Sequence, residues 1–332
     1  MKNVFKTLAL TTLFYILISG SSQTFAKDLS KSSLKSTSYG LGIATRQYIN
    51  LRSTPDMNNN TNKIAVLMES DRFFIVDDLG EWYKVKYNDN GTLRDGYVYA
   101  LFTMPIRDDS SDSYLGFISS KYESTVYTEN KLTSVRNPGT VSNNAGDAGG
   151  KSYGLYQLSS NRGTLDVFLN YLKTHSDGNQ FYDKLNNAKI ADGNKYNRSF
   201  DTTWKQLATN NTSKFFELQH KFVKTKYYDV AASMLKDKYN FDISTKSLAL
   251  KEALWSTAVQ YGIKGNGTTT KGAIDIFAEA GLNNGEKELI TRIYDIKIEH
   301  AESKNNDGLK NRALSEKNDV LNMYNSYNEI AK

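Results

Sequence analysis

The segment Tyr-Leu-Gly-Phe-Ile-Ser-Ser-Lys-Tyr-Glu-Ser at residues 114–124 is the part of the chain around which the rest is organised. Three of its apolar residues recur at the i, i+3 and i+7 positions of one helical face: Leu115, Ile118 and Tyr122. Asp112 or Ser113 is available as the N-cap of this helix. Glu123 is therefore expected at the inner end of an amphipathic helix.

A polar, glycine-rich loop follows this helix. Arg-Asn-Pro-Gly at residues 136–139 signals a turn, and Asn-Asn-Ala-Gly-Asp-Ala-Gly-Gly at 143–150 is too rich in glycine for a helix. Such a loop can bring Asp147 back toward Glu123. The segment Ser-Tyr-Gly-Leu-Tyr-Gln at 152–157 comes directly after it.

This ordered set of segments resembles the lysozyme superfamily, and within it the goose-type lysozymes, soluble lytic transglycosylases and chitosanase-like muramidases. Residues 146–157, taken with Trp-Ser-Thr-Ala-Val-Gln-Tyr-Gly at 255–262, are similar to lysozyme-like domains of phage tail and secretion-spike proteins. The resemblance implies that Glu123 is catalytic.

The first 38 residues are expected to be a leader and a linker. Residues 1–26 combine two lysines, an apolar run at 8–18 and a small-x-small cleavage site at 24–26, which is typical of a secretory signal peptide. The apolar run is shorter than the roughly 20 residues that a spanning helix needs. An uncleaved anchor is the alternative, and residues 27–38 are a Ser/Lys/Thr-rich linker. We expect a secreted, wall-associated protein of a Gram-positive bacterium.

The composition limits the remaining possibilities. A length of 332 residues suggests two or three domains at about 100–200 residues each. Cleavage of the leader lowers the net charge from +6 to +4, and no Lys/Arg cluster of the kind that binds nucleic acid is present. The chain has no cysteine, which excludes disulfides and a thiolate nucleophile.

Residues 39–106 are expected to form a small β-barrel. Six short β-prone runs alternate with Asn-, Asp- and Gly-rich turns: 43–45, 48–51, 63–68, 73–76, 82–87 and 96–102. The segments 50–55, 81–85 and 96–100 resemble the bacterial SH3-like domain, with a long hairpin loop at 88–95. The resemblance implies binding to wall peptides through an aromatic surface of Trp82, Tyr83, Tyr97 and Tyr99. The alternative for Trp82 is the barrel core.

After a polar linker at 107–113, residues 114–332 are predicted to be mainly helical. Apolar faces recur at 165–172, 215–222, 250–261, 273–277 and 289–296, with a less regular final helix at 309–327. The predicted fold is thus multidomain: a small all-β SH3-like barrel, then a mainly α lysozyme-like (α+β) domain.

Cleaving a glycosidic bond needs a carboxylic acid and usually a second carboxylate. Glu123 fits the acid, because tyrosines around it would desolvate its carboxyl; the alternative is a solvated Glu at a helix end. Asp147 could activate water, or it could merely stabilise its own turn.

The residues expected to bind the sugar come from three segments. They are Ser124, Ser152, Tyr153, Tyr156, Gln157, Gln260 and Tyr261, of which either Tyr153 or Tyr156 could instead be core. Trp255 is expected to be structural. The three histidines, His175, His220 and His300, form no metal motif, so neither a metal nor a cofactor is expected.

Together with these resemblances, the sequence predicts a monomeric peptidoglycan hydrolase that cuts the glycan strand between N-acetylmuramic acid and N-acetylglucosamine and is held on the wall by the SH3-like domain. A muramidase is the first expectation, and a lytic transglycosylase or a glucosaminidase stays open. A non-catalytic wall-binding or assembly protein is the alternative. Neither nucleic acid nor an integral membrane segment after cleavage is expected.

Overall fold

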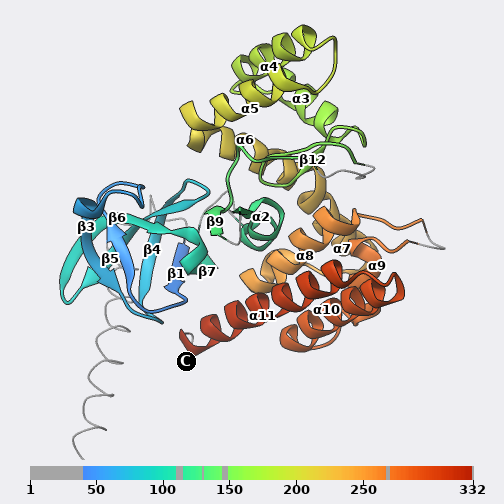
Figure 1. The fold of residues 1–332 in the computed structure, drawn as a ribbon. Coiled ribbons are helices and arrows are strands. Elements are labelled where there is room, and N and C mark those ends of the chain that lie inside the picture. The colour runs from blue at the N-terminus through green and yellow to red at the C-terminus, as the bar shows by residue number, and fades with distance from the viewer. Residues whose placement is uncertain (1–39, 110–114, 129–130, 144–148, 267–269, 331–332) are drawn as a thin grey trace, which may run out of the picture.

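The computed structural model describes residues 40–109, 115–128, 131–143, 149–266 and 270–330. Figure 1 shows a curled sheet on one side and a helical region on the other, with α2 (Phe117–Ser124) between two groups of helices. The predicted leader and linker at 1–38 lie outside the described residues.

Seven antiparallel strands make the sheet. They are β1 (Gly40–Ala44), β2 (Ile49–Arg52), β3 (Lys63–Leu67), β4 (Arg72–Asp78), β5 (Trp82–Asp89), β6 (Thr92–Tyr99) and β7 (Thr103–Asp108). Their order is β3-β2-β6-β5-β4-β1-β7. Short 3-10 turns at Asn60–Asn62 and Ala100–Phe102 precede β3 and β7.

This sheet corrects the prediction of an SH3-like barrel. The strand order ends in β3 and β7, which do not pair with one another, so the sheet is curled but open. A seventh strand, β7, lies at 103–108, where the prediction had the end of the barrel and the start of a linker. Its Pro105 explains why it was missed, and also why it lies at an edge, where a missing N–H costs no ladder bond.

The predicted long hairpin loop at 88–95 is also wrong. β5 and β6 pair along their full length, from Trp82 opposite Tyr99 to Asp89 opposite Thr92. Only Asn90 and Gly91 turn the chain, at φ 51° and 92°. This Asn-Gly pair is the residue combination that a tight type I′ hairpin turn demands.

Helices make up most of the remaining chain. They are α2, α3 (Thr164–Thr174), α4 (Asn179–Ala191), α5 (Arg198–Asn210), α6 (Thr212–Val223), α7 (Asp229–Tyr239), α8 (Leu248–Tyr261), α9 (Ala273–Ala280), α10 (Glu286–Ser303) and α11 (Asp307–Ile330). A π-helical turn at Lys224–Tyr228 joins α6 to α7, and a 3-10 turn at Ile243–Thr245 precedes α8. The predicted apolar faces lie on α3, α6, α8, α9 and α10 and are largely buried.

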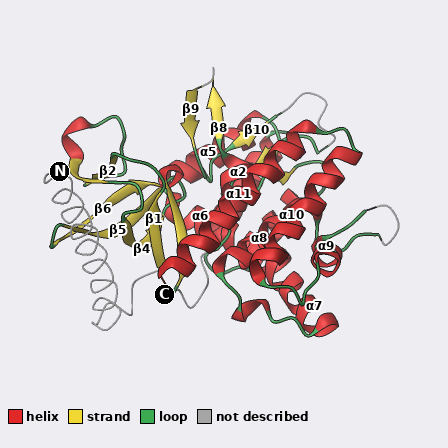
Figure 2. Cartoon of the chain, turned by 90° about the horizontal axis from the view of Figure 1, so that it is seen from below, coloured by secondary structure: helices red, strands yellow, loops and turns green. Residues whose placement is uncertain are grey.

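Two small sheets follow α2. The first pairs β8 (Val126–Thr128) with β9 (Lys131–Ser134), a hairpin that projects from the helical region in Figure 2. The second consists of β10 (Val141–Ser142), β11 (Ser152–Tyr153) and β12 (Leu158–Ser159), with β11 in the middle.

The large sheet and the helices share one hydrophobic core. Buried residues of β2 to β6 belong to the same cluster as those of α2, α6 and α8. The ring of Tyr83 on β5 stacks on Phe117 of α2, with centroids 6.3 Å apart. The predicted fold class, a separate barrel followed by a lysozyme-like domain, is therefore replaced by an open sheet packed on a helical region.

Candidate functional site

The first helix of the helical region, α2, is capped by a side chain from another helix. The Glu252 carboxylate on α8 accepts hydrogen bonds from the backbone N–H groups of Gly116, Phe117 and Ile118, at 2.7, 3.0 and 3.1 Å. These are donors that a helix start leaves unpaired, and a negative charge is favoured there. The predicted caps, Asp112 and Ser113, lie outside the described residues, and Gly116 occupies the N-cap position.

Glu252 is completely buried. Burial raises the pKa of its carboxyl to about 7, although the three N–H groups and the charge of Arg136 act in the opposite direction. Gly116 has a left-handed φ of 99°, and a Cβ there would come within 2.8 Å of the Trp255 ring. The start of α2 can therefore pack closely on α8, because Gly116 has no side chain to collide with Trp255 and the buried Glu252 accepts its free N–H groups.

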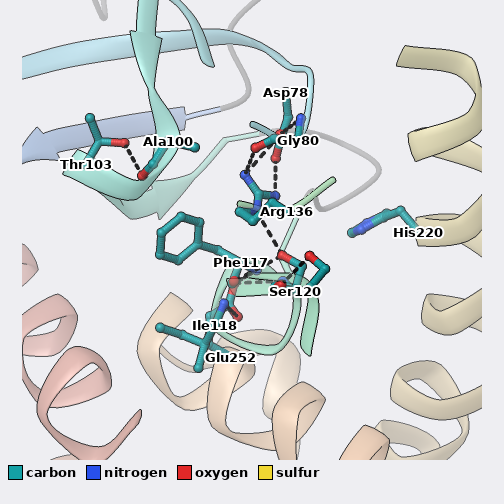
Figure 3. Close-up of polar contacts among 12 residues, drawn as sticks. Asp78, Gly80, Ala100, Thr103, Phe117, Ile118, Ser120, Arg136, His220 and Glu252 are labelled. Atoms are coloured by element: carbon teal, nitrogen blue, oxygen red, sulfur yellow. Dashed lines mark hydrogen bonds and ion pairs between the residues drawn. The ribbon is translucent and has the colours of Figure 1, made fainter. Parts of the chain in front are cut away.

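The middle of α2 is fixed by Arg136, which is buried between the large sheet and the helices. Its guanidinium donates to both oxygens of Asp78, at 3.1 and 2.7 Å, and to the carbonyl of Gly80 at 3.1 Å. Its Nε donates to the Ser120 hydroxyl on α2 at 2.8 Å. Figure 3 shows Arg136 between the β4–β5 turn and α2.

The end of α2 carries Glu123, the predicted acid. Its side chain is only 15% exposed, and its Oε1 lies 2.7 Å from Nη2 of Arg312 on α11. Beside it, Lys121 Nζ and Tyr122 Oη both donate to Asp319 of α11, at 2.6 and 2.9 Å. Glu123 therefore lies at a fixed helix end, mostly shielded from water, and is paired with a cation.

Arg312 is itself held by a buried group of charges. Its Nε donates to Glu316 at 2.7 Å, and Glu316 also accepts from Lys297 of α10 at 2.9 Å and from the Ser256 hydroxyl at 2.7 Å. Glu316 and Lys297 are fully buried. Burial alone would raise the pKa of Glu316, but the charges of Lys297 and Arg312 outweigh it and hold the pKa at about 2.

The small sheet β10-β11-β12 lies against the end of α2. The Thr140 hydroxyl is 3.5 Å from the carbonyl of Ser124, and the Thr140 carbonyl accepts from Gly154 N–H at 2.7 Å. Gln157, in the turn between β11 and β12, has a left-handed φ of 49°, and its amide is held by the Ser142 hydroxyl and the Gly154 carbonyl. A non-glycine residue in this conformation costs about 1–3 kcal/mol, and such strain is concentrated at functional sites.

Not all of the predicted sugar-binding side chains lie where a sugar could meet them. The hydroxyls of Tyr153, Tyr156 and Ser124 are bonded to Asp201, His220 and the Ser120 carbonyl. All three predicted residues are buried, so their side chains are structural, in line with the alternative for the tyrosines. Ser152 and Gln157 stay half-exposed.

Gln260 and Tyr261 end α8 on the side of the buried charges. Both are half-buried, and the Tyr261 ring lies 5.8 Å from Lys297 Nζ and 5.5 Å from the His300 ring. Burial raises the pKa of Tyr261 to about 12. Neither amide atom of Gln260 has a hydrogen-bond partner among the described residues. Asp147 lies outside the described residues.

The predicted wall-binding aromatics point inward rather than outward. Trp82 and Tyr99 are 7% and 5% exposed and cluster with Val135 of the helical region, and Tyr83 is 2% exposed. Tyr97 is half-buried against the same cluster. These side chains join the sheet to the helical region, because the core continues across that boundary.

Neither a metal site nor a membrane span is found in the described part of the chain. No three His, Asp or Glu side chains there come together as metal ligands. The described helices are all too short or too polar to cross a bilayer.

The fold and site together define a helical region, docked on an open sheet, that fixes one shielded carboxylate at a helix end. Residues 115–317 match a family described as type VI secretion system spike protein VgrG3-like, C-terminal. The chain belongs to this family, and the match contains both Glu123 and Arg312.

A curated relative gives the same result. The type VI secretion system spike protein VgrG3 of Vibrio cholerae serotype O1 is 31% identical over 241 residues, which cover 70% of this chain. The chain spans about a fifth of the length of that relative, since the match covers 20% of it.

These matches correct several predictions. The assignment to secreted wall hydrolases with an SH3-like and a lysozyme-like domain is wrong, because both matches are to a spike protein. The predicted function, cleavage of peptidoglycan by a wall-anchored lysozyme, and its wall-binding alternative are wrong for the same reason. Peptidoglycan as the partner is also wrong, and the aromatics meant to hold it are mostly buried.

Proposed function

We propose that the helical region of this VgrG3-like chain is a glycoside hydrolase, with Glu123 as its catalytic carboxyl. The observation that carries the proposal is the state of Glu123: it is 15% exposed, lies at the end of α2 and is held by Arg312 at 2.7 Å. A carboxyl that takes part in glycosidic cleavage must be fixed, partly shielded from water and still open to substrate on one side.

The surroundings of Glu123 support this role. Thr140, which contacts the end of α2, directly precedes the small sheet β10-β11-β12. Half-exposed Ser152 lies on this sheet, and half-exposed Gln157, with its left-handed φ, lies in the β11–β12 turn. Hydroxyl and amide groups of this kind can bond sugar hydroxyls. Both residues lie within the family match, whereas the large sheet lies outside it. Secretion, which the leader-like pattern at 1–26 indicates, stays a prediction from the sequence.

The test is release of reducing ends from a panel of glycans that includes chitin, chitosan, xylan and murein. We expect the intact chain to cleave at least one of them and Glu123→Gln to lose about 100-fold or more of that rate, because the amide cannot transfer a proton.

Glu217→Gln is the matched control. Glu217 is also a partly buried carboxylate in an ion pair, at 25% exposure and 2.6 Å from Lys221, but it lies on α6. This variant should cleave like the wild type. Full activity of Glu123→Gln would remove Glu123 from the reaction, and no cleavage of any glycan by the wild type would refute the hydrolase.

A further inference from the structure

Three polar side chains of α11 face the end of α2 and the neighbouring helices. Arg312, Glu316 and Asp319 recur at i, i+4 and i+7, which places them on one side of the helix. Arg312 forms an ion pair with Glu123, and Asp319 accepts hydrogen bonds from Lys121 and Tyr122. Two contacts about two helical turns apart fix both the position and the direction of the α2 end.

Arg312 forms equally short ion pairs with Glu123 and with Glu316. Its side chain is 17% exposed and lies between Glu123 and the fully buried Glu316, with 2.7 Å to each. The buried Lys297 neutralises Glu316 from the other side, at 2.9 Å. Three contacts therefore link four charges of alternating sign, from Lys297 through Glu316 and Arg312 to Glu123. Of these four residues, the proposed reaction uses only Glu123.

Stability alone is a weak reason for such a group. Buried ion pairs rarely stabilise a fold more than apolar side chains of the same volume, because both charges lose their hydration. A planar guanidinium does, however, set the orientation of a carboxylate. The contact with Glu123 joins Nη2 of Arg312 to one carboxylate oxygen, Oε1, so this contact leaves Oε2 for a substrate.

We propose that Arg312 is the positioning residue of the site: anchored by Glu316, it holds the Glu123 carboxyl in its reactive orientation. This inference rests on the proposed hydrolase function. Arg312 acts through Glu123, and nothing in its geometry requires it to touch the sugar itself.

The first arm of the test measures kcat and KM on the glycan that the wild type cleaves. Arg312→Gln should lower kcat by about tenfold to 100-fold with KM nearly unchanged, since a misplaced reacting group costs rate more than binding. Arg312→Lys keeps the charge and should restore part of kcat.

Lys317→Gln is the control, because it breaks another α11–α10 ion pair, Lys317 with Asp295 at 2.5 Å, away from Glu123. It should leave kcat unchanged. Full kcat in Arg312→Gln, or an equal loss in Lys317→Gln, would overturn the proposal.

The second arm needs no activity and separates the two proposals. Urea midpoints are measured for Glu123→Gln, Arg312→Gln and the double variant. Coupled residues give a double variant that loses less than the sum of the single losses. Additive stability losses in the variants would overturn the role of Arg312, even if the wild type cleaves a glycan. If the losses are coupled but the wild type cleaves no glycan, the proposed hydrolase function is refuted, although the contact between Arg312 and Glu123 is confirmed.

Discussion

Glu252 shows how a single buried carboxylate can join two helices. It supplies acceptors for three N–H groups at the start of α2 from a position in the interior of α8. The sequence did not predict this capping role, because a Glu on a helix is usually exposed and hydrated. The only hint is that apolar residues make up most of α8 around it, from 248 to 258.

Glu252 should make stability depend on pH. Its carboxyl has a pKa of about 7 in the folded chain against an ordinary 4.5, so the folded state binds the extra proton between these values. The resulting stabilisation is present below pH 4.5 and is lost as the pH rises through about 7. The loss is on the order of 3 kcal/mol.

Urea unfolding between about pH 4.5 and about pH 8 measures this slope. In Glu252→Gln the free energy of unfolding should lack this decrease over the same pH range, because an amide does not titrate there. Parallel curves for the two proteins would show that this carboxyl is not the source of the dependence.

At the scale of elements, prediction worked where the buried face is apolar. α8, α9 and α10 follow the expected apolar spacing. The final helix had an irregular pattern because its inner face is partly charged, with Arg312, Glu316 and Asp319 in place of apolar residues. Charged residues that pair with distant helices take apolar positions on the inner face, so they interrupt the apolar period from which a helix is predicted.

The buried charges of α11 predict the effect of Glu316→Gln. The variant leaves Lys297 buried without its counter-charge and frees Arg312, so the free energy of unfolding should fall by about 3–5 kcal/mol. Urea unfolding measures it. Glu302→Gln breaks an exposed pair with Lys310 between the same two helices and should unfold at nearly the wild-type urea concentration. Equal shifts would mean that burial of the pair is unimportant.

At the scale of the molecule, the sequence located the strands but not the way they meet the helices. Trp82 and Tyr99 have the β-prone neighbours that a strand requires, yet they pack against Val135 and not inside a closed barrel. Asp78 and Arg136 are 58 positions apart and form a buried ion pair. A contact of this range depends on the docking of the two parts, which local patterns do not encode.

This ion pair should determine how firmly the sheet is attached to the helical region. Asp78→Asn leaves the Arg136 charge buried without compensation, which should cost about 3–5 kcal/mol of unfolding free energy. The double variant Asp78→Leu with Arg136→Met leaves no unpaired buried charge, so it should recover part of that loss. The recovery is partial because the Gly80 carbonyl and the Ser120 hydroxyl lose their hydrogen-bond donor. Denaturant unfolding of the single and double variants measures both effects.

Asp95→Asn is the matched control on the same sheet, because it breaks the Lys86–Asp95 pair, where Asp95 is 59% exposed. It should change stability by no more than about 1 kcal/mol. If the double variant were less stable than Asp78→Asn alone, the unpaired charge would not be the main cost, and the bonds from Arg136 to Gly80 and Ser120 would carry the attachment instead.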